Sequence, residues 1–209
     1  CTVLGIMKSV SELKLPINVV GIIPSVENMP GGDAYRPGDI IKLYNGKTAE
    51  ILNTDAEGRL ILADALAYGE KQYSPKAIID FATLTGACIV ALGNNVAAIV
   101  SNDKQLTKKI TDSSKTTTEE VWELPLTQDY MDMIKSDVAD IKNVGIGKAA
   151  GTITAAAFLK SAIKDTPWVH FDIAGVAWTQ GAATKQKPYN PKGATGFGVR
   201  LILDYLQKL

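Results

Sequence analysis

The sequence has one histidine, two cysteines and no net charge, and each scarcity excludes a class of function. With His170 as its only histidine, the chain cannot build a zinc site from several histidines. A Ser-His-Asp triad would have His170 as its only candidate base. His170 alternates with bulky neighbours, so we expect it to be structural. Cys1 and Cys88 lie at no metal or redox spacing, and apolar residues around Cys88 indicate an inert core position. These features favour a reducing, cytoplasmic compartment.

Charge and hydropathy are balanced along the chain. The 22 basic and 22 acidic residues cancel, so there is no electrostatic reason to expect nucleic acid or an anionic membrane as a partner. No apolar run approaches the length of a membrane span. The 209 residues are 46% hydrophobic and 21% charged, which is typical of a globular protein with one large domain or two small ones.

The most informative stretch is the run 53–59, Asn-Thr-Asp-Ala-Glu-Gly-Arg. Two carboxylates, Asp55 and Glu57, stand two residues apart where an extended segment turns into a helix, and Arg59 follows. Carboxylates at this spacing hold hard or borderline divalent cations, and a nearby guanidinium holds an anion. The run also fits a helix capping box, with Thr54 as N-cap and Glu57 reaching back. Both interpretations stay open, because Thr54 can cap while the two acids bind metal.

The pattern of apolar residues predicts strands that alternate with helices. The predicted strands cover 17–23, 40–44, 47–52, 77–82, 97–100 and 168–173. The predicted helices cover 1–14, 60–73, 104–114, 152–163 and 197–209. Asn45-Gly46 predicts a hairpin between the second and third strands. The order favours an α/β fold with a mixed, mostly parallel central sheet flanked by helices.

Three segments between these elements are less regular. Residues 24–39 are rich in proline and glycine and predict a long surface loop. In the stretch 116–144 we expect Trp122 and Tyr130 to anchor the packing. A loop rich in Gly, Lys and Pro follows Trp178.

Short motifs along the whole chain carry a family resemblance. They occupy residues 27–30, 36–39, 53–64, 82–87, 172–175 and 193–196. In sequence and order they resemble motifs of the leucyl aminopeptidases, the dinuclear metallopeptidase family M17. The resemblance implies the α/β fold of that family's catalytic domain, incomplete at its N-terminal side. Because Cys1 already lies inside an amphipathic pattern, we expect 1–209 to be the C-terminal part of this domain. The N-terminal domain and the first part of the catalytic domain are then absent from the chain.

The resemblance implies roles for three residues of the run 53–59. Asp55 would ligate one divalent metal ion and Glu57 would bridge two, with Zn, Mn or Mg as the candidate metals. Arg59 would hold a bicarbonate ion that acts as general base. Two cations that share a water lower its pKa and polarise the scissile carbonyl. The implied activity is the release of N-terminal, preferentially leucine-like, residues from peptide substrates.

The resemblance also implies a substrate pocket. Thr83, Leu84 and Gly86 would contact the peptide and shape the pocket for its first residue. Ala174 and Ala177 would line the same pocket. An apolar wall favours leucine-like side chains, although one methylene more or less discriminates by only about 1–3 kcal/mol.

The chain departs from the family's pattern in one respect. The family's other metal ligands, a Lys and two Asp, and its catalytic Lys lie upstream of the segment that matches Cys1. We therefore expect this chain alone neither to bind the metal pair nor to hydrolyse peptides. Two other functions stay open: a non-catalytic structural or interaction module, and a dinuclear hydrolase of another amide or ester. Members of the family assemble as homohexamers, so we expect a homo-oligomer.

Overall fold

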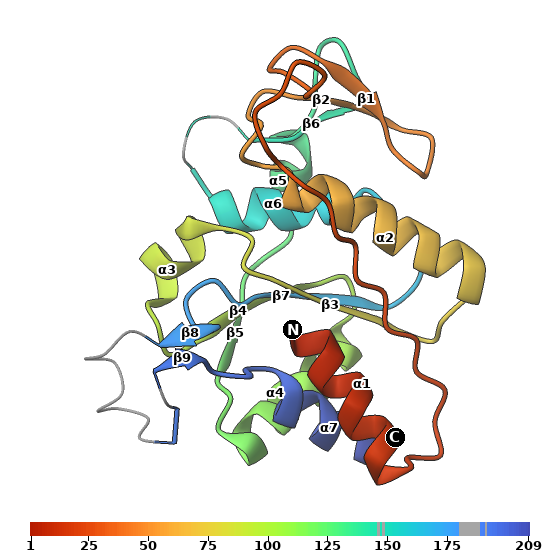
Figure 1. Ribbon diagram of the computed structural model, residues 1–209, viewed down its shortest axis with the longest axis vertical. Helices are drawn as coiled ribbons and strands as arrows, with labels where there is room; N and C mark the ends of the chain where they lie inside the picture. The colour runs from red at the N-terminus through yellow and green to blue at the C-terminus, as the bar shows by residue number, and fades with distance from the viewer. Residues whose placement is uncertain (146, 148, 180–188, 191) are drawn as a thin grey trace.

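A four-stranded sheet separates two layers of helices (Figure 1). The computed structural model describes residues 1–145, 147, 149–179, 189–190 and 192–209, so most of the loop predicted after Trp178 lies outside the described residues. Neighbouring strands follow the order β3 (Ile78–Ala82), β7 (Trp168–Asp172), β4 (Ala97–Ser101) and β5 (Val121–Glu123). Two of the three pairings are parallel, and β4 pairs with β7 in antiparallel fashion. The predicted mixed, mostly parallel central sheet is confirmed.

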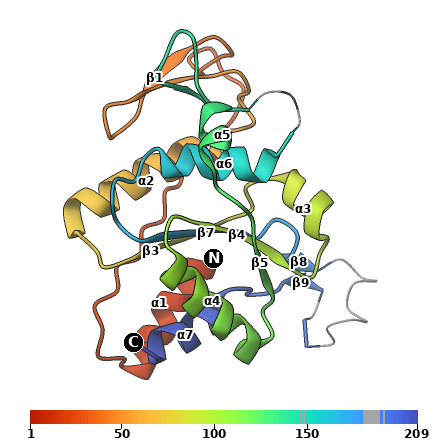
Figure 2. The same cartoon turned by 180° about the vertical axis from the view of Figure 1, so that it is seen from behind.

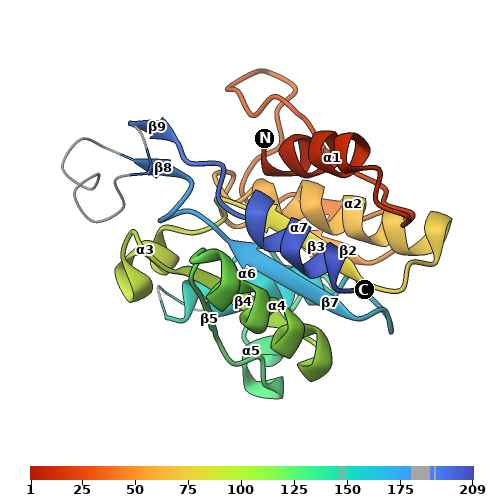
Figure 3. The same ribbon diagram turned by 90° about the horizontal axis from the view of Figure 1, so that it is seen from below.

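Alternating side chains of β7 build the two cores on either side of the sheet. Val169 and Phe171 belong to the core on one face, and Trp168 belongs to the core on the other. The first face is covered by three helices, which lie side by side in Figure 3: α1 (Thr2–Leu13), α4 (Lys104–Thr117) and α7 (Val199–Gln207). The second face is covered by α2 (Gly58–Tyr73) and α6 (Gly151–Lys160).

A small second sheet lies beyond α2 and α6 (Figure 2). Its strands are β1 (Ile40–Lys42), β2 (Thr48–Glu50) and β6 (Ile141–Lys142), and the short helix α5 (Gln128–Asp132) lies near them. β1 and β2 form the predicted hairpin, and Gly46 in its turn has φ +91°, which favours glycine. β2 pairs in parallel with β6. The hairpin therefore leads directly from β2 into the run 53–59.

The remaining elements lie at one end of the central sheet. They are α3 (Gly86–Leu92), β8 (Trp178–Thr179) and β9 (Gly193–Ala194), and the last two pair with each other. α3 follows β3, and β8 comes shortly after β7, so the carboxyl ends of two adjacent parallel strands meet here. None of the helices in the described ranges combines the length and apolar character that a bilayer crossing requires.

The strand predicted at 17–23 is wrong. The segment contains no strand, and Val20 and Ile23 are 53% and 46% exposed. A strand needs a hydrogen-bonded neighbour, and none of the strands in the described chain pairs with this segment. Instead it runs across helices, where Gly21 packs against Met7 and Ile22 reaches Gly69 of α2.

Trp122 was expected to anchor the packing, and this prediction is also wrong. It lies on the edge strand β5 and is 65% exposed, while its neighbour Val121 packs against the core. Because side chains alternate across a strand, burial of Val121 turns Trp122 outward. The predicted surface loop at 24–39 is confirmed, since it holds no helix or strand and is largely exposed.

Candidate active site

The two predicted metal ligands lie on a turn between β2 and α2. Asp55 is exposed and Glu57 is half-buried. Among the described residues, neither carboxylate accepts a hydrogen bond or pairs with a cation. Their oxygens are therefore available to a ligand.

The predicted capping box does not form. α2 begins at Gly58, with Glu57 at the N-cap position and no side-chain hydrogen bond to the helix. A capping box would need the helix to begin immediately after Thr54, but the Thr54 carbonyl instead accepts from side chains elsewhere in the chain. The helix terminus thus makes no use of the Glu57 carboxylate.

Long-range hydrogen bonds hold the backbone of this turn. Asn143 is fully buried after β6, and its Oδ1 accepts from the backbone N of Leu52 at 2.9 Å and of Asn53 at 3.3 Å. Its Nδ2 donates to the Asn53 carbonyl at 2.6 Å. The Tyr35 hydroxyl donates to the Thr54 carbonyl at 2.7 Å. The main chain is therefore fixed while the two acidic side chains remain unpaired.

The charges of both acids act on one neighbouring group. The pKa of Tyr35 is raised, first by burial and then by the negative charges of Glu57 and Asp55. Both negative charges therefore act on the phenol that donates to the backbone of the same turn. Two acids gathered on a fixed turn suit a divalent cation, which takes oxygen ligands.

Arg59 lies in the first turn of α2 and is 8% exposed. Its Nε is buried and has no hydrogen-bond partner in the described chain. Burial lowers the pKa of Arg59 to about 10, against the opposing effect of the negative charge of Asp172. The side chain is still a cation at neutral pH. A buried cationic donor without a partner is costly, and a bound anion would satisfy it.

The predicted substrate-contacting segment reaches the start of α2. A Cβ added at Gly58 would lie 3.4 Å from Leu84 Cδ1, so the Leu84 side chain packs against the backbone at Gly58, the residue between Glu57 and Arg59 in the sequence. Thr83 is exposed. A Cβ at Gly86 would meet nothing within 4 Å, so the space beside it is open.

The segment after β7 lies beside the segment after β3. Asp172 Oδ1 accepts from the backbone N of Leu84 and of Ala174, both at 3.2 Å. The structure thus brings Leu84 and Ala174 together. Ala177 donates its N–H to the Ile173 carbonyl and packs against the core on the other face of the sheet, away from Leu84.

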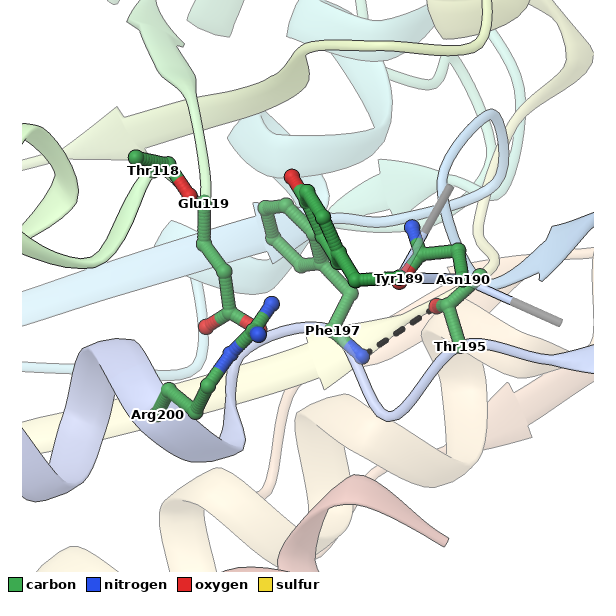
Figure 4. A pocket seen from close by; sticks show the side chains of 7 residues that line it. All are labelled: Thr118, Glu119, Tyr189, Asn190, Thr195, Phe197 and Arg200. Carbon is green, nitrogen blue, oxygen red and sulfur yellow. Dashed lines mark hydrogen bonds and ion pairs between the residues drawn. The ribbon is translucent and has the colours of Figure 1, made fainter. Parts of the chain in front are cut away.

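A small pocket at the start of α7 is separate from this region (Figure 4). Its buried acid, Glu119, accepts from the backbone N of Gly198 at 3.1 Å and of Leu201 at 2.8 Å, and pairs with Arg200 at 3.3 Å. The carboxylate is occupied by the helix terminus, so we assign this pocket no ligand.

Comparison with known proteins decides the family. The model of the cytosol aminopeptidase family, catalytic domain, matches residues 1–203. The chain belongs to the cytosol aminopeptidase family. A relative from Cenarchaeum symbiosum, named "Probable cytosol aminopeptidase", is 74% identical over 207 residues, which are 99% of this chain and 42% of the relative. A relative of the same name from Geobacter sulfurreducens is 53% identical over 205 residues, covering 98% of this chain and 40% of the relative.

A solved structure shares the fold of this member of the cytosol aminopeptidase family. A tomato leucine aminopeptidase mutant superposes with a TM-score of 0.88 and 39% sequence identity, covering 100% of this chain and 40% of that chain. The chain therefore spans about two fifths of the length of the relatives it matches. The resemblance read from the motifs and the fold class are confirmed.

The donor set among the described residues is incomplete for two metals. No group of three or more His, Cys, Asp or Glu side chains that could hold a metal ion occurs among the described residues. Asp55 and Glu57 have the right chemistry for divalent cations, but two carboxylates fill only part of two coordination spheres. They fit as a portion of the site.

Sequence reasoning missed three residues of the region: Tyr35, Asn143 and Asp172. Tyr35 and Asp172 lie beside or within motifs that the sequence already shows, but nothing local indicates what their side chains contact. Asn143 lies in a stretch without a clear pattern and carried no signal at all.

Proposed function

We propose that the protein is a metal-dependent aminopeptidase that binds two divalent cations with the help of Asp55 and Glu57. The supporting observation is that neither carboxylate has a partner among the described residues, while hydrogen bonds from Asn143 and Tyr35 fix the backbone beneath them. When bound, such a pair of cations lowers the pKa of a shared water and polarises the scissile carbonyl. Zn, Mn and Mg are the candidate metals.

Arg59 supplies an anion site beside the acids. Its buried Nε has no hydrogen-bond partner among the described residues, so a planar anion such as bicarbonate would satisfy a donor that lacks an acceptor there. An anion held there would stand ready to accept a proton in the reaction.

The peptide's first side chain would lie between the segments that follow β3 and β7. Leu84 and Ala174 are brought together there, Thr83 is exposed and Gly86 faces open space. Apolar walls of this kind favour leucine-like residues at the peptide N-terminus. Ala177 remains a proposed lining residue.

We further expect the isolated chain to be inactive, because its described residues hold only part of a dinuclear donor set. The alternative of a non-catalytic module was motivated by the missing upstream ligands and stays open, but Thr54 and Glu57 do not serve it as a helix cap, since the capping box does not form. A homohexameric assembly and a cytoplasmic location stay predictions. The names of the relatives support the location, and sedimentation of the intact protein tests the assembly.

The proposal is tested by Asp55→Ala and Glu57→Ala in the intact protein. We expect release of leucine from leucine p-nitroanilide to fall by more than about 100-fold, because even residues that only support metal ligands cost about 10- to 100-fold. Calorimetric titration with zinc or manganese should show weaker binding in both variants. Asp137→Asn, which changes an exposed acid elsewhere, is the matched control and should leave both readouts unchanged. Undiminished turnover and metal binding in the two variants would remove the proposal.

A further inference from the structure

One buried carboxylate joins the two segments proposed to form the substrate pocket. Asp172 is the last residue of β7, lies opposite Ala82 at the end of β3, and is 0% exposed. The chain leaves the sheet after both residues, toward Leu84 on one side and Ala174 on the other. Asp172 thus lies between the segment that follows β3 and the segment that follows β7.

The carboxylate of Asp172 accepts hydrogen bonds from both of these segments. Its Oδ1 accepts from the backbone N of Leu84 and of Ala174, at 3.2 Å each. Its Oδ2 accepts from Thr85 Oγ1 at 2.6 Å, and this hydroxyl lies 2.8 Å from Thr152 Oγ1 in α6. The same hydroxyl accepts from the backbone N of Cys88 at 3.2 Å and so caps α3. One carboxylate therefore connects β7, α3, α6 and the segment after β3.

Close packing fixes the segment after β7 from its other side. A Cβ added at Gly175 would lie 2.2 Å from the carbonyl oxygen of Gly93, at the end of α3. Only glycine permits so close an approach of two backbones. With α3 on one side and the Asp172 carboxylate on the other, the position of Ala174 relative to Leu84 is determined.

We propose that Asp172 is a positioning residue that sets the spacing of the Leu84 and Ala174 segments, and thereby the width of the pocket for the first side chain of a peptide. The inference rests on the proposed aminopeptidase function. Asp172 acts through the main chain of the two segments and need not touch the substrate. Its loss should therefore change which side chain is preferred more than it changes whether peptides are cleaved.

A second buried acid on the same face of the sheet provides a matched control. Asp80 of β3 is 7% exposed, and its oxygens contact Trp168 Nε1 at 2.7 Å and His170 Nδ1 at 2.6 Å. These partners belong to the strand β7, and none of the hydrogen bonds of Asp80 among the described residues goes to Leu84 or Ala174. Removing Asp80 disturbs another buried polar group and leaves the link between the Leu84 and Ala174 segments in place.

Two substitutions at the position separate spacing from mere destabilisation. Asp172→Ala removes all three acceptor contacts, so the two segments lose their common link. Asp172→Asn keeps an oxygen that can accept from both backbone N–H groups, while the amide nitrogen can donate to Thr85 Oγ1. If spacing is the role of Asp172, asparagine should rescue what alanine loses.

The experiment measures kcat/KM of the intact protein on leucine and alanine p-nitroanilides, with thermal unfolding of each variant. We expect Asp172→Ala to reduce the leucine-over-alanine preference by about 10-fold, the size of a lost apolar contact in a pocket. The change should appear mainly in KM for the leucine substrate. Asp172→Asn should stay within about 3-fold of the wild-type preference. Asp80→Ala should lower the unfolding temperature and leave the preference unchanged.

Binding of free L-leucine, the proposed product, gives a readout that does not require turnover. Calorimetry should show it weakened in Asp172→Ala and retained in Asp172→Asn. If the alanine variant does not fold, Asp172→Ser is used, because a serine hydroxyl is too short to reach both segments.

The outcomes distinguish the two proposals. Unchanged preference in folded Asp172→Ala or Asp172→Ser, or an equal change in Asp80→Ala, overturns the positioning role. A wild-type protein that hydrolyses neither substrate overturns the proposed function, and the positioning role with it.

Discussion

The acids of the turn at 53–57 and the acids of the central sheet are held in opposite ways. Within the described ranges, the side chains of Asp55 and Glu57 have no hydrogen-bond or ion-pair partner, and other residues fix the backbone that carries them. Asp80 and Asp172 have side chains whose oxygens are all engaged within the fold. An acid that accepts several hydrogen bonds contributes to structure, and an unpaired acid on a rigid support is available for chemistry. The hydrogen bonds of the side chain thus distinguish a structural acid from one that is available to a ligand, although both are Asp or Glu in the sequence.

The largest change in stability is expected at Glu119, a buried acid whose oxygens accept hydrogen bonds within the fold, as those of Asp80 and Asp172 do. Glu119→Ala should lower the free energy of unfolding by about 2–4 kcal/mol, because the backbone N–H groups of Gly198 and Leu201 would be buried without an acceptor. Asp55→Ala in the metal-free protein should change it by no more than about 0.5 kcal/mol. Denaturant unfolding measures both. Equal losses of unfolding free energy in the two variants would contradict the distinction between structural acids and acids available to a ligand.

The support of the turn gives the next effect. Asn143→Ala should lower the free energy of unfolding by about 1–3 kcal/mol, because buried backbone groups of Leu52 and Asn53 lose their partner. It should also weaken metal binding by the intact protein by about 10- to 100-fold, as expected for a residue that orients ligands. Zinc titration and denaturant unfolding check the two effects. A variant that loses stability and keeps full metal affinity would show that the turn needs no support.

Alkaline pH should reveal the buried surroundings of Cys88, to which the charge of Asp172 contributes. Burial, followed by the negative charge of Asp172, raises the pKa of the Cys88 thiol from 9.0 to about 11. A group whose pKa is higher in the folded state contributes stability below its unfolded pKa, and that stability is lost as pH rises toward the folded value. The wild type should lose about 1.4 kcal/mol between pH 8 and pH 10 relative to Cys88→Ala. Parallel unfolding curves for both proteins would contradict this.

The smallest effect is expected from Tyr35→Phe. It removes one hydrogen bond to the Thr54 carbonyl, worth about 1 kcal/mol, while Asn28 still donates to the same oxygen at 3.2 Å. Metal affinity should fall by less than in Asn143→Ala, and the same zinc titration compares them. A larger loss in Tyr35→Phe would reverse the assigned order of the two supports.

Local patterns predicted what depends on local structure. The hairpin around Asn45-Gly46, the helix at 60–73 and the strands β3 and β7 follow from turn chemistry and apolar periodicity. The acids of the run 53–59 were proposed as metal ligands from their spacing and the resemblance; the family comparison supports the resemblance, and the metal-binding role stays a prediction.

Contacts between distant residues explain the failures. The hydrogen bonds from Asn143 to the turn and from Asp172 to Leu84 join residues about 90 positions apart, and no local signature announces such a pair. The capping-box prediction failed for the same reason. Hydrogen bonds from Asn28 and Tyr35 engage the Thr54 carbonyl, and the helix begins at Gly58 and not directly after Thr54. The segment 17–23 has the composition of a strand, but a strand also depends on its neighbour.

The way the turn is supported has a consequence for redesign. Asn143 and Tyr35 bind main-chain atoms, so the identity of the side chains at positions 55 and 57 does not enter into the support. Other donor groups can be installed there without dismantling the scaffold. An imidazole in place of one carboxylate would shift the ligand set toward softer ions. The turn is thus a natural starting point for engineering metal preference while the rest of the fold stays as it is.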